Sequence, residues 1–418
     1  MDSSVLIIIF IEELFAVFLL RKHGIIKSIK SLIICAFLIC AAFTIRAAYF
    51  DYETTDYQWF LKEWVDFYRT HGGFKGLRYS NGNYNIPYLY FIALFSYSSI
   101  NDLYLIKLLS CFFDVVLADA AMLCVLKSNG SKLRGAICFF IVLFLPTVVM
   151  NGAVWGQCDS IYTSLALLGI ALALPDGENG GCSHPILSMV CIAASFGFKL
   201  QAVFIMPIYI ILFIYKRFKW YHFAAFPVTY LIMILPAVLL GRPFIDCIML
   251  YADQAETVGT ALNYNAPSVF ALINNITDTD SAAHIGIICA FAAMLLIFAV
   301  AYIKRKKLNS ASVLCLSLLM VIIIPFLLPH MHDRYFFAAD VLSVILSVLI
   351  PLSIPCAIFT QFASLICYIA YFKTYYVPIG KTYLTNDKGS IALIFAMLIC
   401  AVCFIYASIT PPKRSVKR

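Results

Sequence analysis

Charged residues are scarce in this chain, and their scarcity excludes most classes of soluble protein. Only 12% of the 418 residues are Asp, Glu, Lys or Arg, whereas 63% are hydrophobic. No polar stretch is long enough to fold as a separate soluble domain. Apolar runs of roughly 15 to 22 residues recur along the chain, which is about the length a helix needs to cross the hydrocarbon core. We therefore predict a single all-α polytopic membrane domain over residues 1–418.

Paired cysteine motifs and internal repeats are also lacking. The 15 cysteines are scattered, mostly within apolar runs, and no CxxC pair is followed by a matching second pair. This spacing argues against a zinc site and indicates small buried hydrophobic residues instead. The lack of a clear repeat argues against a transporter built from two similar halves.

Thirteen apolar segments are predicted to span the membrane. They are Val5–Leu20, Ser31–Ala48, Tyr104–Leu126, Gly135–Met150, Ser160–Leu174, Ile186–Phe198, Leu200–Tyr215, Tyr221–Leu240, His284–Ile303, Ala311–Leu328, Ala338–Ile354, Cys356–Phe372 and Ser390–Ser408. The first is short and contains Glu12 and Glu13, but no small-residue cleavage pattern follows it. We therefore expect it to remain in the mature protein.

Dense clusters of basic residues test this layout independently. The clusters are Arg21, Lys22, Lys27 and Lys30; Lys127, Lys132 and Arg134; Lys216, Arg217 and Lys219; Lys304, Arg305, Lys306 and Lys307; and Lys413, Arg414, Lys417 and Arg418. With thirteen spans, all of them fall on one side, which the positive-inside rule makes cytoplasmic. The amino terminus is then outside and the carboxyl terminus inside. The net charge of +8 thus reflects topology, and no nucleic-acid partner is indicated.

The opposite face carries the long loops, of which the largest cover residues 49–103 and 241–283. The stretch DYETTDYQWFLKEWVDFYRTHGG has aromatic residues at helical spacing, which is typical of a short interfacial helix ended by its two glycines. Thr55 followed three residues later by Gln58 fits a capping box and puts Asp56 in the first turn. The apolar segment 87–97 is interpreted as re-entrant or surface-lying, because a further span there would invert every later basic cluster.

Ionisable residues at the membrane boundary are the candidates for chemistry. The stretch NGAVWGQCDSIY puts Gln157 and Asp159 at the head of a span, where Asp159 also fits a helix cap. Lys199 lies between two apolar runs, so we expect it to face a cavity and an anionic partner, with snorkelling as the alternative. Asp56, taken alone, could simply favour the positive end of a helix dipole.

The stretch PHMHDRYFF concentrates four ionisable groups between two apolar runs. Arg334 offers a planar fork of donors that suits phosphate oxygens and stays charged at any pH. His332 can add a donor or a proton, and Asp333 can hold either neighbour. A purely structural ion-pair cluster is the alternative, but the pattern favours a phosphate site at the membrane surface.

Together these stretches resemble a known family. In chain order they read DYQWFLKEWVDFYRTHGGFKGL, GNYNIPYLY, WGQCDSIYT, FKLQAVFIMP, NYNAPSVFALI and PHMHDRYFF. They resemble the bacterial membrane proteins related to the second mannosyltransferase of GPI-anchor synthesis, within the C-type glycosyltransferase superfold. The resemblance runs from about Phe50 to Asp340, and WGQxDSIY and MHxRYF are its most specific elements. The first loop lacks the DxD of some relatives, leaving Asp51 and Glu53 as substitutes, and Asp333 replaces an expected glutamate.

The resemblance implies an inverting transfer of a mannose-like hexose from a polyprenyl-phosphate sugar to a glycan or lipid-linked acceptor. The site would face outward from a bacterial cytoplasmic membrane. Asp56 would be the general base that takes the proton of the acceptor hydroxyl. Arg334, with His332 and Lys199, would bind the departing phosphate. The residues expected to position the sugar or acceptor are Gln157, Asp159, Asp333, Tyr335 and Asn85.

The expected partners are the lipid-linked donor, the acceptor and membrane lipids. No cofactor or metal is required, although the outward carboxylates could hold a divalent metal. Two other functions fit an apolar chain with membrane-embedded cations: a flippase or transporter of lipid-linked saccharides, and a ligase or polymerase that uses lipid-diphosphate sugars. A transporter is expected to place its charges near mid-membrane and to show repeat symmetry. The acid of the first loop and its interfacial helix argue against the ligase.

Overall fold

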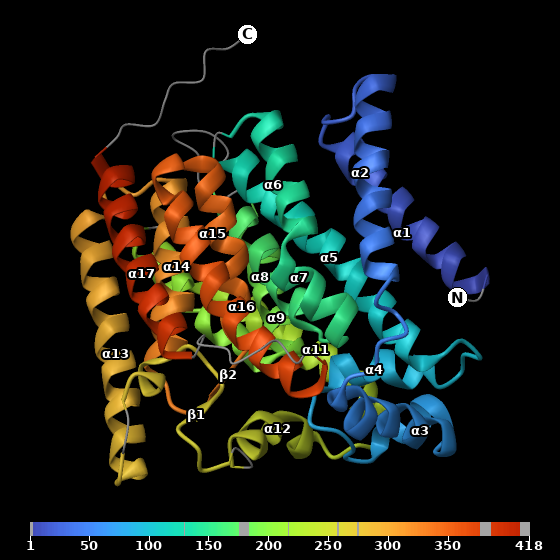
Figure 1. Ribbon diagram of the computed structural model, residues 1–418. Coiled ribbons are helices and arrows are strands. Elements are labelled where there is room, and N and C mark those ends of the chain that lie inside the picture. The colour runs from blue at the N-terminus through green and yellow to red at the C-terminus, as the bar shows by residue number, and fades with distance from the viewer. Residues whose placement is uncertain are drawn as a thin grey trace.

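The computed structural model describes residues 3–128, 130–174, 184–215, 217–256, 259–273, 276–376 and 386–409 (Figure 1). Of the described residues, 79% are helical. Within the described residues, the β-structure is limited to two strands of two residues and one isolated bridge. The predicted all-α polytopic class is therefore confirmed.

The helices follow one another with short connections. The first part of the chain forms α1 (Ser3–Lys22), α2 (Ile29–Ala47), η1 (Tyr57–Leu61), α3 (Lys62–Thr70), η2 (Gly73–Arg78), α4 (Ile86–Phe95), α5 (Asp102–Lys127), α6 (Lys132–Phe144), α7 (Pro146–Val149), η3 (Met150–Trp155), α8 (Asp159–Ala173) and α9 (Pro185–Phe198). The second part forms η4 (Leu200–Phe204), α10 (Ile208–Ile214), η5 (Trp220–Ala224), α11 (Ala225–Leu239), α12 (Phe244–Glu256), β1 (Asn263–Tyr264), η6 (Val269–Ala271), α13 (Thr279–Lys304), α14 (Ser310–Leu327), β2 (Met331–His332), α15 (Phe337–Leu349), η7 (Pro351–Ser353), α16 (Ile354–Tyr376) and α17 (Asn386–Ile409).

Each of the thirteen predicted spans corresponds to a helix or a helix pair. Among the described residues, eight helices are long and apolar enough to cross a membrane, and a ninth crossing results if α6 and the segment α7–η3, bent by 46°, count as one. The other four coincide with shorter apolar helices, which are Asp159–Ala173, Pro185–Phe198, Leu200–Ile214 and Phe337–Leu349. The segment interpreted as re-entrant forms the ten-residue helix α4. At 1.5 Å per residue, a helix of that length is too short to cross the hydrocarbon core.

Burial separates central from peripheral helices. In their most apolar stretches, α5 and α14 are each 72% buried, whereas α13 is 22% buried. Small residues such as Ala118 and Ala121 of α5 are fully buried, which allows close helix packing. The outer faces of α1 and α13 expose large aliphatic and aromatic side chains, as helices that contact lipid do.

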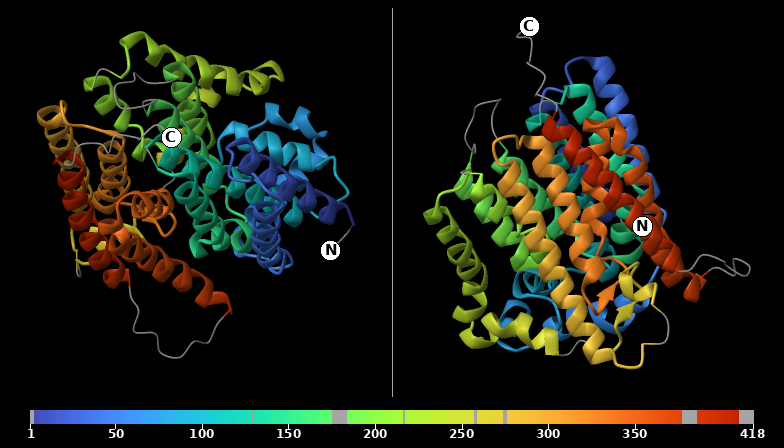
Figure 2. Two further views of the ribbon diagram at one scale, coloured as in Figure 1. Left: turned by 90° about the horizontal axis from the view of Figure 1, so that it is seen from above. Right: turned by 90° about the vertical axis from the view of Figure 1, so that its left-hand side faces the viewer.

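The connections that carry the basic clusters lie at one end of the bundle, as predicted, and the large loops lie at the other. The amino-terminal end of α2, the α5–α6 and α13–α14 connections and the carboxyl-terminal end of α17 gather at one end (Figures 1 and 2). Helices α3, α4 and α12 and strands β1 and β2 gather at the other. Lys216 and the cluster from Lys413 to Arg418 lie outside the described residues.

The large loop 241–283 at this second end is tied to the rest of the molecule. Strand β1, in the 241–283 loop, pairs in parallel with β2, which lies between α14 and α15, so that Asn263 faces Met331 and Tyr264 faces His332. An isolated bridge also joins Asn265 to His332. The pairing therefore holds the second large loop against the PHMHDRYFF stretch.

The capping box predicted for the first loop is wrong in its residues. Thr54, not Thr55, provides the cap, because its hydroxyl accepts a hydrogen bond from the Tyr57 backbone amide at 3.4 Å. The Gln58 amide nitrogen donates to the Glu53 carboxylate at 3.1 Å instead of turning back to the helix start. Asp56 nevertheless lies in the first turn, and Gly72 and Gly73, both with positive φ, follow the end of α3 as predicted.

Candidate active site

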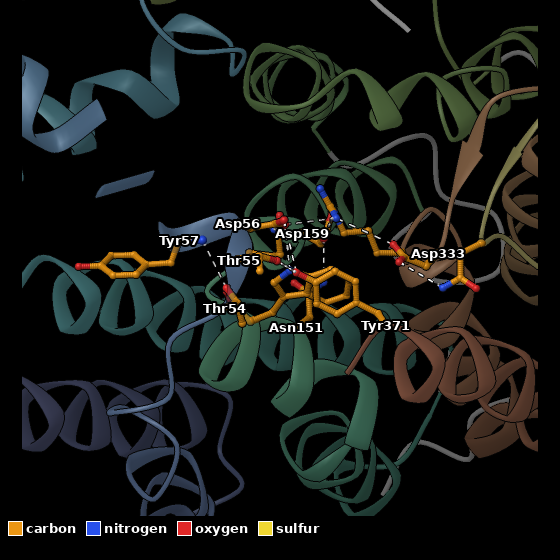
Figure 3. Close-up of polar contacts among 12 residues, drawn as sticks. Thr54, Thr55, Asp56, Tyr57, Asn151, Asp159, Asp333 and Tyr371 are labelled. Atoms are coloured by element: carbon orange, nitrogen blue, oxygen red, sulfur yellow. Dashed lines mark hydrogen bonds and ion pairs between the residues drawn. The ribbon is translucent and has the colours of Figure 1, made fainter. Parts of the chain in front are cut away.

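The Asp56 carboxylate is held by side chains from two distant segments. Its Oδ2 atom accepts hydrogen bonds from Trp155 Nε1 at 2.9 Å and from Gln157 Nε2 at 2.6 Å (Figure 3). The Tyr371 hydroxyl lies 3.4 Å from Oδ1 and also contacts the Thr55 hydroxyl at 3.0 Å. About a quarter of the Asp56 side chain, 26%, remains exposed. The carboxylate is thus oriented on one side and open on another.

The backbone of the NGAVWGQCDS stretch explains how Trp155 and Gln157 reach Asp56. The π-helix η3 ends at Gly156, whose φ of 75° is left-handed and favours glycine. A Cβ atom on Gly152 would lie 3.1 Å from the Asp114 carboxylate, so the glycine permits a close approach of the two segments. The turn directs the indole and the amide toward the same carboxylate oxygen.

Asp159 takes part in a buried polar network and does not cap α8. The residue preceding α8, Cys158, makes no side-chain capping hydrogen bond. The Asp159 carboxylate accepts a hydrogen bond from Asn151 Nδ2 at 2.7 Å and forms an ion pair with Lys199. The cap interpretation is therefore wrong, because tertiary partners satisfy the carboxylate.

Lys199 has the anionic partner that its position predicted. It follows α9, is 7% exposed, and its ammonium group contacts Asp159. The ammonium also lies 5.8 Å from the centre of the Tyr84 ring and 5.9 Å from that of Tyr162. A cation enclosed in this way does not snorkel to the membrane surface.

Arg334 stands among three carboxylates at ion-pair distance. Its guanidinium nitrogens lie 3.8 Å from Asp56, 3.8 Å from Asp159 and 3.9 Å from Asp333. These distances exceed those of a hydrogen bond, and the buried Nε atom has no hydrogen-bond partner among the described residues. Such an arrangement leaves donor capacity on the guanidinium for an additional anion.

Burial shifts the pKa values of the two residues that precede Arg334. The pKa of His332 is lowered to about 4, first by burial and then by the positive charges of Arg334 and Lys199. The ring also stacks on Tyr264 at 4.8 Å. Burial raises the pKa of Asp333 to about 6, although Arg334 and the Asn265 amide, 3.5 Å away, oppose the shift. At neutral pH His332 is therefore neutral and Asp333 is largely ionised.

Two predicted positioning residues lie at different distances from this cluster. The Tyr335 ring is 5.3 Å from the ring of His332, next to the Arg334 loop. Asn85 is 1% exposed, its carbonyl oxygen caps α4, and its amide lies 3.4 Å from the Tyr230 hydroxyl. Its neighbour Tyr84, which the sequence does not single out, donates to the side-chain amide oxygen Oε1 of Gln157 at 2.9 Å. The structure thus brings Tyr84, and not Asn85, into contact with the site.

Other contributors were not selected from the sequence. Trp155 and Asn151 belong to the quoted NGAVWGQCDS stretch, and Asn265 belongs to NYNAPS, so short motifs could have indicated them. Tyr371 lies in the apolar run of α16, where nothing distinguishes it from a lipid-facing aromatic residue. Within the described residues, no group of three or more His, Cys, Asp or Glu side chains could hold a metal ion.

An apolar cavity of about 580 Å³ lies among helices α9, α10, α11, α13 and α14. Its lining includes Met206, Phe226, Phe291 and Leu328, from segments α9 to α14. Leu328 immediately precedes the PHMHDRYFF stretch, and Val203, also in the lining, follows Lys199 by four residues. Through these two residues the cavity is connected to the chain segments that carry the charged cluster.

A membrane-embedded helical bundle with a charged cluster at one end and an adjoining apolar cavity is a suitable architecture for chemistry on a lipid-linked substrate. Residues 83–329 match the family model described as glycosyltransferase family 87. The match covers more than half of the chain, which therefore belongs to this family. It contains Gln157, Asp159 and Lys199, whereas Asp56 precedes it and Arg334 follows it.

No curated protein and no solved structure matches the chain. The family match establishes that the protein is a glycosyltransferase, a transferase of the membrane. The narrower relation to the second mannosyltransferase of GPI-anchor synthesis stays a prediction.

Proposed function

We propose that the protein transfers a mannose-like hexose from a polyprenyl-phosphate sugar to a glycan or lipid-linked acceptor, with inversion at the anomeric carbon. The observation that carries the proposal is the position of Arg334. Its Nε donates no hydrogen bond to any described residue, and its guanidinium lies 3.8 Å from the Asp56 carboxylate. A phosphate receptor and a base are then side by side, as a single displacement requires.

Asp56 is the general base in this proposal. The acceptor oxygen attacks the anomeric carbon while the bond from that carbon to the phosphate oxygen breaks. The acceptor proton passes to Asp56, and the bonding electron pair leaves with the phosphate. Trp155 and Gln157 both donate to Oδ2, which supports Oδ1 as the atom that receives the proton.

Arg334 is the principal ligand of the departing phosphate, and its permanent charge stabilises the anion that develops. Lys199 is already paired with Asp159, so it contributes less free charge than the sequence suggested. His332 is neutral above about pH 4 and serves as a hydrogen-bond partner, not as a cation. The sugar, or the cationic side chains of Arg334 and Lys199, would be oriented by Gln157, Asp159, Asp333 and Tyr335.

The apolar cavity supports a lipid-linked donor. A polyprenyl chain has no polar groups, and the cavity is lined by apolar and aromatic side chains, among them Val203 and Leu328 from the segments that carry Lys199 and Arg334. Burial of each methylene stabilises such a complex by about 0.8 kcal/mol. Nucleotide sugars, which lack a lipid chain, would leave this cavity unfilled.

The donor class is tested with purified protein in lipid nanodiscs and radiolabelled sugars. The arms are polyprenyl-phosphate hexoses, polyprenyl-diphosphate sugars and nucleotide sugars, each with and without a chelator. We expect transfer from the monophosphate donors alone and inverted anomeric configuration in the product. Transfer from the diphosphate would indicate the ligase or polymerase function instead, and loss of transfer with chelator would indicate a metal.

The outward orientation of the site is part of the proposal. It rests on the basic clusters, which gather at the end of the bundle opposite α3, α12 and β2. A single cysteine at the exposed position Thr260, in a cysteine-depleted background, should react with an impermeant thiol reagent in intact cells. Labelling that requires permeabilisation would reverse the topology.

A further inference from the structure

A second, small cavity adjoins Asp56 on the side of Tyr371, and we call it the polar cavity because Glu53, Thr54, Thr55 and Gln58 contribute to its lining. It measures about 160 Å³ and is lined by residues 52–55, Gln58, Tyr371 and Phe372. Tyr371 links the cavity to the proposed base, because its hydroxyl lies 3.4 Å from Asp56 Oδ1. Arg334 instead approaches Asp56 Oδ2, at 3.8 Å. The two carboxylate oxygens therefore face different surroundings.

The lining of this cavity combines hydrogen-bonding groups with aromatic walls. Glu53 offers carboxylate oxygens, and Gln58 offers an amide with both donors and an acceptor. The rings of Tyr52 and Phe372 lie 6.2 Å apart at an angle of 59°. Hydroxyl groups around a ring with apolar faces fit such a lining, whereas a lipid chain offers no hydrogen-bonding group to Glu53 or Gln58.

The size of the cavity restricts what enters it. At about 30 Å³ per water molecule, its volume corresponds to about five waters, which is the scale of one monosaccharide ring. An oligosaccharide or polyprenyl chain needs far more room. The separate apolar cavity, at about 580 Å³, is the larger of the two and contains no such carboxylate in its lining.

We propose that the polar cavity binds the terminal sugar of the acceptor and presents its hydroxyl to Asp56. The Thr55 and Tyr371 hydroxyls, 3.0 Å apart, stand between the cavity and the Asp56 carboxylate. They can hold the acceptor hydroxyl in line with Oδ1. The inference rests on the proposed glycosyl transfer, and it adds that the acceptor ends in an uncharged sugar held by Glu53 and Gln58.

Cysteine protection tests the binding site without requiring turnover. Gln58→Cys is introduced into a cysteine-depleted background, and its labelling by a charged methanethiosulfonate is followed by mass spectrometry. Octyl glycosides of mannose, glucose and galactose, below micelle formation, serve as probes. Glu63→Cys is the matched control, because Glu63 is exposed on α3 and does not line the cavity.

We expect at least one octyl glycoside to slow the labelling of Gln58→Cys at least five-fold and to leave Glu63→Cys unchanged. Polyprenyl phosphate without a sugar should protect neither. Protection by polyprenyl phosphate and not by the glycosides would overturn the inference, because the cavity would then belong to the donor. Equal labelling rates with and without every glycoside would overturn it as well.

Steady-state kinetics separate this inference from the proposed function. In a wild-type protein that transfers hexose to an octyl glycoside, Gln58→Ala and Glu53→Gln should raise the acceptor KM about ten-fold and leave the donor KM within two-fold. An unchanged acceptor KM in both variants would refute the subsite while glycosyl transfer stands. If the wild-type protein uses no polyprenyl-phosphate donor but the glycosides still protect Gln58→Cys, the donor assignment fails and the sugar site remains.

Discussion

The guanidinium carbon of Arg334 lies 5.1 Å from the centre of the Trp155 ring. The nitrogen of the same indole donates to Asp56 Oδ2 at 2.9 Å, and the ring stacks on Tyr371 at 4.0 Å. One aromatic side chain therefore contacts the proposed base, the proposed phosphate ligand and the edge of the polar cavity. Substitutions in this group are expected to be coupled and not additive.

The indole nitrogen of Trp155 provides the first prediction. Trp155→Phe keeps an aromatic ring beside Tyr371 but removes the donor to Asp56. A hydrogen bond to a charged group contributes about 1.5–3 kcal/mol, so we expect kcat to fall about ten- to one-hundred-fold. The control is Trp59→Phe, whose ring is 62% exposed and which should retain activity. Equal activity of both variants would show that the indole does not orient the base.

Arg334→Lys separates charge from geometry. Lysine keeps the positive charge but loses the planar fork, so transfer should fall at least ten-fold while the donor Kd rises. The protein should remain monodisperse in detergent. The contrasting variant is Arg46→Lys, because Arg46 is fully buried and pairs with Asp114 at 2.9 Å, and we expect it to lose stability. Loss of folding in Arg334→Lys too would indicate a structural ion pair.

Asp56→Asn tests the general base. Because Thr54 caps this helix start, the substitution removes no capping hydrogen bond. Loss of general-base assistance costs about a hundred- to ten-thousand-fold in turnover, and donor binding should remain. Asp51→Asn is the matched control: Asp51 accepts a hydrogen bond from Tyr104 and should tolerate the change within a few-fold. An Asp56→Asn protein with near-normal turnover would transfer the role to Asp51 or Asp159.

The sequence predicted the segments of the fold better than the length of its spans. Helices α8 and α15 are apolar on nearly all faces because they are buried in the bundle, so hydropathy alone cannot distinguish them from full crossings. The alternation of long loops and basic clusters along the chain, in contrast, can be read without knowing the depth of any helix. It correctly predicted which connections lie at each end of the bundle. Local pattern thus gave the number and order of the apolar segments but not their depth.

The candidate site shows the same division between local and tertiary information. Motifs indicated Asp56, Gln157, Lys199 and Arg334, because each is a polar or ionisable residue at the boundary of an apolar segment. Tyr371 carried no local signal because only tertiary packing brings α16 to Asp56. Asp159 was compatible with a helix cap, and only the structure shows that Asn151 and Lys199 satisfy it.

The raised pKa of Asp333 predicts that donor binding strengthens at low pH. Arg334 and Lys199 face Asp56, Asp159 and Asp333, so the ionised cluster carries one more negative than positive charge. Below a pKa of about 6, Asp333 becomes neutral and repels the donor phosphate less. The donor Kd should therefore fall as pH decreases from 7 to about 5.

Asp333→Asn is the matched variant for this pH dependence. It should bind the donor at pH 7 with the affinity that the wild type reaches only near pH 5, and its Kd should vary little between these values. His332→Gln should leave the wild-type profile in place, because the pKa of His332, about 4, lies below this range. A Kd that is independent of pH in the wild type, or identical profiles for wild type and Asp333→Asn, would contradict the prediction.

Filling the apolar cavity should discriminate donors by chain length. Val203 lines the cavity and is 39% exposed, so Val203→Trp can occupy the space without entering a packed core. Loss of burial for two or three methylenes, at about 0.8 kcal/mol each, should raise the KM of a long-chain donor about ten-fold or more. A short-chain donor, which reaches less far into the cavity, should be affected two-fold at most. The control is Ile288→Trp, on the exposed face of α13, where Ile288 is 66% exposed and outside the lining. Equal effects of Val203→Trp on both donors would place the polyprenyl chain elsewhere on the protein.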